Sequence, residues 1–232
     1  NHGVAFARGM EDGGVLSVMK HFPGHGSTTA DSHLELPVIN KTLQELKQYD
    51  FAPFQQYIDA GLGGCLTAHL YIPAIDKRRV PGTMSKAYVT NLLQKKMHFN
   101  GLIFTDALGM EGAKEVKGSV CVNAFLAGND ILLMPNEVGP EIAAIKQAIA
   151  AGKIKQKDVD ARVKKILRFK YALGLDTKPQ IDLANIVADI NAPESKVLQR
   201  KMVASAVTVV KSANDILPLK NLNNRKIAVV VM

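Results

Sequence analysis

One fourteen-residue stretch, KHFPGHGSTTADSH at residues 20–33, gathers side chains that could do chemistry. It holds three of the six histidines of the chain, together with Lys20 and Asp31. Imidazole and carboxylate groups can ligate a metal ion, and they can also transfer protons. The stretch is therefore a candidate metal site, phosphate loop or acid–base edge of an active site.

The metal and phosphate interpretations are weaker than the acid–base one. His21, His25, Asp31 and His33 are chemically suited to zinc, but their spacing matches no standard zinc motif, and the intervening proline and glycines exclude a helix. A Walker-type phosphate loop requires a lysine after its glycines, and none follows here. His25 taken alone is an ordinary satisfied polar residue.

Asp31 and His33 form a candidate dyad. In an extended segment, residues two apart point to the same side, so the Asp31 carboxylate can accept a hydrogen bond from the His33 ring. The carboxylate favours the imidazolium and orients it. Such a histidine can protonate a leaving group and then take a proton from water.

Asp106 is the candidate partner of this dyad. It follows the apolar run GLIFTDA (101–107), a position where an aspartate can also be the N-cap of a helix. Facing the anomeric carbon of a sugar, its carboxylate would instead act as a nucleophile or stabilise an oxocarbenium ion.

Short apolar runs alternate with amphipathic segments of helical length, which predicts an α/β fold with parallel strands. Reactive side chains at the carboxyl ends of successive strands favour a (β/α) barrel over a doubly wound sheet, whose glycine fingerprint is missing. The expected strands are 15–20, 63–69, 101–107 and 129–135, and the polar residues that close them are Lys20, His21, Thr67, His69, Thr105, Asp106 and Asn136.

Four βα units are half of an eight-stranded barrel. The sequence predicts helices at 137–152 and 156–173, an extended linker containing Pro179 and Pro193, and a helix near 195–206. The last run, KIAVVVM, is expected to open a second α/β domain. The predicted domains are therefore a partial catalytic barrel over 1–175, and a linker, helix and second-domain start over 176–232.

Composition narrows the function class. With 232 residues and 47% apolar composition, the chain can bury a sizeable core, and no apolar run is long enough to span a bilayer. The formal charge is +8, but much of the excess lies on late amphipathic helices, where a basic face is usually a solvated surface, so nucleic acid is not an expected partner. Cys65 and Cys121 lie in apolar runs and are expected to be buried thiols.

The helix predicted at 156–173 should have one buried face and one solvated face. The side chains expected to be buried are Val159, Val163, Ile166 and Leu167, and those expected in solvent are Lys164, Lys165 and Arg168.

Four motifs carry a resemblance to a known family. KHFPGHGSTTADSH, TAHLYIPAID, VPGTMSKAYVT and GLIFTDALGMEGA, in this order, resemble family 3 glycoside hydrolases, and among them the bacterial β-N-acetylglucosaminidase (β-hexosaminidase) branch. The resemblance covers residues 1 to about 175. In that branch this loop supplies an Asp–His dyad as the acid/base, whereas the β-glucosidase and β-xylosidase branches draw a carboxylic acid from elsewhere.

The resemblance implies roles for individual residues. His33 corresponds to the acid/base, Asp31 to its orienting partner and Asp106 to the nucleophile. Lys20 and His21 resemble a pair that binds sugar hydroxyls, and His69 is assigned to substrate binding with them.

The implied reaction is retaining hydrolysis of a terminal β-linked N-acetylglucosamine, without a metal or an organic cofactor. The expected partner is a carbohydrate, namely an N-acetylglucosamine-containing oligosaccharide or a muropeptide as in peptidoglycan recycling. Alternatives are a β-glucosidase- or β-xylosidase-type hydrolase, an N-acetylglucosaminide phosphorylase and a non-catalytic sugar-binding half-barrel.

The chain lacks the first half of the family's barrel. We therefore expect weak or no activity of this segment alone, and self-association through open barrel edges. The chain starts with Asn rather than Met, so an upstream segment is expected and both cytoplasmic and periplasmic locations stay open.

Overall fold

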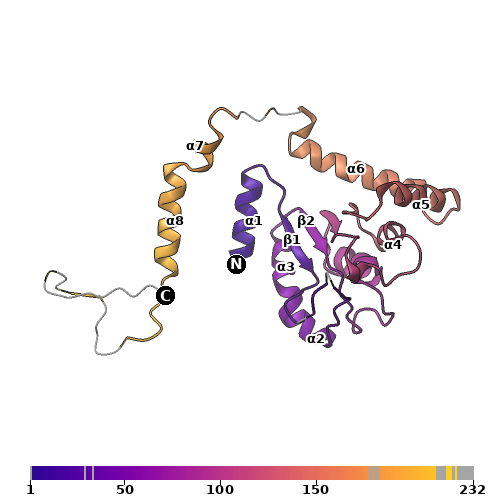
Figure 1. Ribbon diagram of the computed structural model, residues 1–232, viewed down its shortest axis with the longest axis horizontal. Coiled ribbons are helices and arrows are strands. Elements are labelled where there is room, and N and C mark those ends of the chain that lie inside the picture. Colours follow the sequence, from indigo (N-terminus) through magenta and orange to yellow (C-terminus); the bar gives the residue numbers. More distant parts are fainter. Residues whose placement is uncertain are drawn as a thin grey trace. The chain divides into compact units, whose positions relative to one another are not determined.

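The chain divides into two compact units in a computed structural model, Asn1–Pro179 and Gln180–Met232. The structure describes residues 2–28, 30–32, 34–177, 180, 183–212, 218–220 and 223. Figure 1 shows the order of the elements along the chain. They are α1 (His2–Asp12), β1 (Val18–Phe22), α2 (Leu43–Glu45), η1 (Leu46–Asp50), α3 (Phe51–Asp59), β2 (Gly64–Thr67), η2 (Gly82–Met84), η3 (Ala87–Lys96), β3 (Leu102–Thr105), η4 (Glu111–Ala113), α4 (Val120–Ala127), α5 (Val138–Ala150), α6 (Gln156–Ala172), η5 (Leu175–Thr177), α7 (Ile186–Ile190) and α8 (Pro193–Ala206).

A parallel sheet forms the centre of the first unit. Its order is β1-β2-β3, with Gly64 opposite Val18 on one side and opposite Leu102 on the other. The α/β fold class predicted from the sequence is confirmed. The fourth expected run, 129–135, lies beside β3 but pairs with it only through a parallel bridge between Phe104 and Ile131. Whether these units are half of an eight-stranded barrel stays a prediction.

One face of this sheet is covered by helices, and the other is open. Cys65 and Ile103 point to the covered face, where both have no exposed surface and pack with side chains of α1, α3 and η3. Because side chains alternate along a strand, Leu66 and Phe104 point to the opposite face and are only half-buried. Burying one such side chain is worth about 1.5–3 kcal/mol, so the helix-covered face supplies the stability.

The helix before β2 begins with a capping box that the sequence encodes. The Thr42 hydroxyl accepts from the Glu45 backbone N–H at 3.3 Å, and the Glu45 carboxylate accepts from the Thr42 N–H at 2.8 Å. This start sets the position of the continuous helical segment α2–η1–α3, and thus of Phe51 and Phe54, which pack on Phe22.

The expected faces of α6 are wrong in part. Val163 and Leu167 are 48% and 57% exposed instead of buried. Lys165, expected in solvent, instead forms an ion pair with Asp130 at 2.7 Å, and Asp130 also accepts from the Ile103 N–H. The charged pair, rather than apolar periodicity alone, therefore sets which side of α6 faces the sheet.

The second unit differs from the expected extended linker. α7 is a short helix within that segment, and Pro193 is the first residue of α8 instead of a linker residue. A proline suits that position because the first helical N–H has no partner within the helix. The predicted strand KIAVVVM lies outside the described residues.

Two further expectations can be compared with the structure. Cys65 and Cys121 are buried free thiols, as predicted, and burial raises the pKa of the Cys121 thiol to about 12. Within the described part of the chain, no helix combines the length and the apolar character needed to cross a membrane.

Candidate active site

The carboxyl ends of the three strands lie side by side. The Ala68 N–H donates to the Phe22 carbonyl at 2.8 Å, and the Asp106 N–H donates to the Thr67 carbonyl at 3.0 Å. Lys20 and His21 lie within β1 rather than directly after it, two residues and one residue before its last residue, Phe22. The residues that close these strands are therefore brought to one edge of the sheet, as predicted from their order in the sequence.

Asp106 is half-buried directly after β3. Its Oδ1 accepts from the Ala107 backbone N–H at 2.9 Å. The next helical element, η4, is preceded by Met110, so Asp106 is not the residue that caps it. The N-cap alternative therefore does not apply, and the carboxylate is held by the turn that follows it.

This turn is joined to the end of the fourth run. The Leu108 and Gly109 N–H groups donate to the Leu133 and Met134 carbonyls, both at 2.9 Å. A Cβ on Gly109 would lie 2.5 Å from Asn136 Oδ1 and 3.3 Å from the Met134 carbonyl oxygen, so a larger residue there would displace the Asn136 side chain. The turn after Asp106 is thus fixed from two sides.

A network of buried hydrogen bonds connects the end of β2 with the segments around Thr83 and Asn129. Asn129 Nδ2 donates to the Thr83 and Ala124 carbonyls at 2.8 Å, and the Thr67 hydroxyl donates to Asn129 Oδ1 at 2.9 Å. Thr67, Thr83 and Asn129 are at most 1% exposed. Sequence reasoning missed Asn129, whose only signal is a polar residue immediately before an apolar run.

The stretch 20–33, here called the histidine loop, is described by the structure at residues 20–28 and 30–32. Its described part packs against the segment that follows Asp106. His25 Nε2 and the Ser32 hydroxyl are 3.2 Å apart, and the Gly112 N–H donates to the Ser32 carbonyl at 3.3 Å. The rings of His21 and His25 are 6.0 Å apart between centroids. These contacts bring the backbone next to Asp31 against the loop that carries Asp106.

Asp50 holds the start of the same loop. Its buried carboxylate forms an ion pair with Lys41 at 2.7 Å. A Cβ on Gly24, which has a φ of 129°, would lie 3.2 Å from Asp50 Cβ. The chain therefore turns sharply after β1 only because residue 24 is glycine.

His69 lies two residues after β2 and has no exposed surface. Its Nε2 is 3.0 Å from the Ala107 carbonyl oxygen. Burial lowers the pKa of this imidazole, against smaller raising effects of the Ala107 carbonyl and of the nearby Asp106 charge. The lowered pKa favours the neutral form of His69, which lies next to the turn after Asp106.

The predicted site residues are placed as follows. Asp106, His69 and the backbone around Asp31 lie in one cluster. Lys20 and His21 line a groove of about 1000 Å³ that also includes His25, Leu66 and Phe104. His33 lies outside the described residues. The roles assigned to all six site residues stay predictions.

No three histidine, cysteine, aspartate or glutamate side chains gather as a metal-binding group within the described ranges. The metal alternative drawn from the histidine spacing therefore gains no geometric support from those residues.

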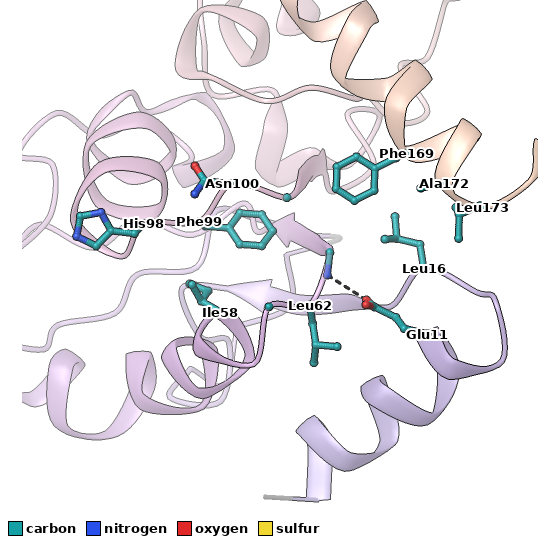
Figure 2. A pocket seen from close by; sticks show the side chains of 13 residues that line it. Glu11, Leu16, Ile58, Leu62, His98, Phe99, Asn100, Phe169, Ala172 and Leu173 are labelled. Atoms are coloured by element: carbon teal, nitrogen blue, oxygen red, sulfur yellow. Dashed lines mark hydrogen bonds between the residues drawn. The ribbon is translucent and has the colours of Figure 1, made fainter.

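A separate pocket of about 450 Å³ lies at the opposite, amino-terminal ends of the strands. Figure 2 shows Glu11 pointing to the Gly63 backbone, whose N–H donates to its carboxylate at 3.0 Å, with Phe99 and Phe169 on another side. The Ser17 hydroxyl donates to the same carboxylate at 2.6 Å. In barrel-like folds, residues at this end of the strands stabilise the fold. The hydrogen bonds of Glu11 to Ser17 and Gly63 therefore fix α1 to the sheet.

Comparison with known proteins supports the interpretation of the strand-end cluster. Residues 1–169 match the family described as "Glycosyl hydrolase family 3 N terminal domain". The chain is 31% identical to Beta-hexosaminidase A of Pseudoalteromonas piscicida over 94% of its own length and 40% of that protein's length. It thus spans about 40% of the length of such curated relatives.

Solved structures that are similar to this chain also include enzymes that act on glycosides. A glycoside hydrolase family 3 β-N-acetylglucosaminidase from Paenibacillus sp. str. FPU-7 is similar with a TM-score of 0.75 and 30% identity, over 78% of this chain and 36% of that one. The beta-glucoside phosphorylase BglX is similar with a TM-score of 0.82 and 27% identity, over 93% of this chain and 41% of that one. The chain belongs to glycosyl hydrolase family 3.

Proposed function

We propose that this chain carries the catalytic part of a retaining glycoside hydrolase that releases terminal β-linked N-acetylglucosamine. The observation that carries this proposal is the contact between the two loops, in which Ser32 meets Gly112 beside Asp106. It is supported by the hexosaminidase names of the relatives. The proposed substrate is an N-acetylglucosamine-containing oligosaccharide or a muropeptide.

The reaction would proceed by double displacement. Asp106 attacks C1 of the sugar, forming a glycosyl–aspartate bond, while His33 donates its proton to the departing glycosidic oxygen. His33, now neutral, takes a proton from water, whose oxygen attacks C1 and releases Asp106. Asp31 orients the imidazole, and Lys20 and His21 bind sugar hydroxyls.

Hydrolysis of aryl glycosides tests the proposal. We expect faster release of the aryl group from an N-acetyl-β-glucosaminide than from the matching β-glucoside or β-xyloside, with the β-anomer of the sugar as first product. A preference for β-glucoside or β-xyloside would favour the other hydrolase branches. Sugar binding without any turnover would favour the non-catalytic alternative.

Phosphorolysis is a second candidate, favoured by the similarity to a beta-glucoside phosphorylase. An imidazole acid/base does not repel phosphate as a carboxylate does, so a phosphate oxygen could attack C1 of the glycosyl-enzyme in place of water. The test is the product: sugar 1-phosphate formed in inorganic phosphate supports phosphorolysis, and free sugar alone supports hydrolysis.

We also propose that the 232-residue chain self-associates and is weakly active by itself. The support is the open face of the sheet and the large groove along its edge strand β1, which Phe6, Val18 and Leu66 line. Exposed strand edges and apolar faces pair readily with another chain.

A further inference from the structure

His69 is a buried histidine that the proposed reaction does not use. It is among the largest fully buried side chains of the chain and lies directly beneath the turn after Asp106. A fully buried imidazole is uncommon unless its polar atoms are paired. The burial of His69 therefore calls for a structural explanation.

The hydrogen bond to Ala107 sets the protonation of the ring. A carbonyl oxygen can only accept, so His69 Nε2 must carry the proton of that 3.0 Å bond. The other nitrogen, Nδ1, is buried and has no hydrogen-bond partner in the part of the chain that the structure describes. A proton on Nδ1 would be a buried donor without an acceptor, which disfavours the imidazolium.

Ala107 connects this ring to the proposed nucleophile. Its N–H donates to Asp106 Oδ1 at 2.9 Å, and its carbonyl accepts from His69. Both ends of one residue are therefore fixed, one by the carboxylate and the other by the imidazole. The two groups belong to successive peptide planes that share the Ala107 Cα, so displacement of the carbonyl is transmitted through Cα to the N–H that holds the carboxylate.

His69 also supports the contact between the two loops. A Cβ placed on Gly112 would lie 3.3 Å from His69 Cβ and 2.9 Å from the Ser32 carbonyl oxygen. His69 Cβ therefore lies next to the contact between Ser32 and Gly112, where the histidine loop meets the segment after Asp106.

We propose that His69 is a positioning residue, a neutral Nε2-protonated imidazole that sets the Asp106 turn through Ala107 and the position of the histidine loop through Gly112. This role is an alternative to the substrate contact expected from the sequence, and it rests on the proposed function of Asp106. A side chain without exposed surface orients the groups that touch the sugar but does not itself touch it.

Three variants test the role, together with a matched control. Gln places an amide nitrogen as many bonds from Cβ as His Nε2, Asn places it one bond shorter, and Leu removes the donor. We expect His69→Leu and His69→Asn to lower kcat by about 10–100-fold, with KM changed less than about 3-fold, because the turn is misplaced but sugar contacts remain. His69→Gln should recover most of kcat, and His2→Gln, an exposed histidine in α1, should change neither constant.

A purely structural role predicts a different pattern. Gln and Leu would then lower the melting temperature alike, with kcat unchanged below the unfolding transition, and this result would overturn the proposal. The same holds if KM rises strongly while kcat is kept, since that indicates direct sugar contact.

A measurement without turnover separates this inference from the proposed function. ¹⁵N-detected imidazole spectra of the unmodified chain should show His69 neutral with its proton on Nε2, whatever the enzyme activity. A proton on Nδ1, or a charged ring at neutral pH, would overturn the positioning role even if hydrolysis is found. Absence of turnover with the expected tautomer would count against the hydrolase function and leave the geometry of His69 intact.

Discussion

Asp106 is half-buried at a strand end, and its carboxylate is held by the next backbone N–H. Asp106→Asn keeps the shape and the acceptor of that bond but removes the nucleophile. We expect kcat for an aryl N-acetyl-β-glucosaminide to fall at least about 10³-fold while the melting temperature is retained. Asp176→Asn, at an exposed position in η5, is the matched control and should keep full activity.

Asp76 is a buried carboxylate that holds the loop after β2. It accepts from Arg78 Nη2 at 2.7 Å and from the Ser85 hydroxyl at 2.6 Å. The hydrogen bond from Arg78, followed by that from Ser85, lowers the pKa of the Asp76 carboxyl against the opposing effect of burial.

This lowered pKa gives a pH-dependent stability. The stabilisation is fully present above the ordinary value of 3.8 and is lost as pH falls through the lower folded-state pKa. We expect Asp76→Asn to lower the free energy of unfolding by about 1–3 kcal/mol at pH 7, with a difference that shrinks as pH falls below 3.8. Urea unfolding of both proteins at several pH values measures this difference in the free energy of unfolding. A difference that does not depend on pH would contradict the prediction. The control is Asp59→Asn, on the exposed side of α3.

At the level of elements, the close approach of the histidine loop to η4 is the geometry on which the site depends. A Cβ on Gly112 would lie 2.9 Å from the backbone oxygens of Ser32 and Glu35, which cannot rotate away. We expect Gly112→Ala to displace the histidine loop and to lower kcat/KM by about 10²-fold, the loss that a misplacement of about 1 Å causes.

Gly139→Ala is the matched control for this change. Nothing lies within 4 Å of a Cβ at Gly139 in α5, so the alanine should be neutral or slightly stabilising. Equal losses of activity in both variants would show that the Ser32–Gly112 contact is not what positions the loop.

The elements could be predicted where local patterns determine them. Lys20, Thr67 and Asp106 follow or end apolar runs, so their meeting at one sheet edge follows from parallel pairing of the strands. The contact of Ser32 with Gly112 and the bond from His69 to Ala107 could not be predicted, because they join segments far apart in the chain and leave no periodic signal. The faces of α6 were assigned wrongly because apolar spacing does not reveal the Lys165–Asp130 ion pair.

At the level of the whole molecule, the open face of the sheet is the surface through which we propose that the chain self-associates. Phe6 in α1 is 74% exposed and lines the same groove as Leu66. Phe6→Glu should weaken self-association, because a charge desolvated in an apolar interface is costly. Tyr171→Glu, on the exposed side of α6 and outside the groove, is the control.

Sedimentation velocity over a range of protein concentrations measures this self-association. We expect the unmodified chain and Tyr171→Glu to shift to larger species as concentration rises, and Phe6→Glu to shift less. A monomer at all concentrations for the unmodified chain would contradict pairing through the open face.

We propose that Asp106 becomes covalently bonded to the sugar while the histidine loop supplies the proton. Incubation with a slowly released 2-deoxy-2-fluoro type glycosyl donor, followed by mass spectrometry of proteolytic peptides, tests it most directly. We expect one glycosyl group on the Asp106 carboxylate and none in Asp106→Asn. Hydrolysis of an aryl N-acetyl-β-glucosaminide with the label on another residue, or with an inverted first product, would contradict it.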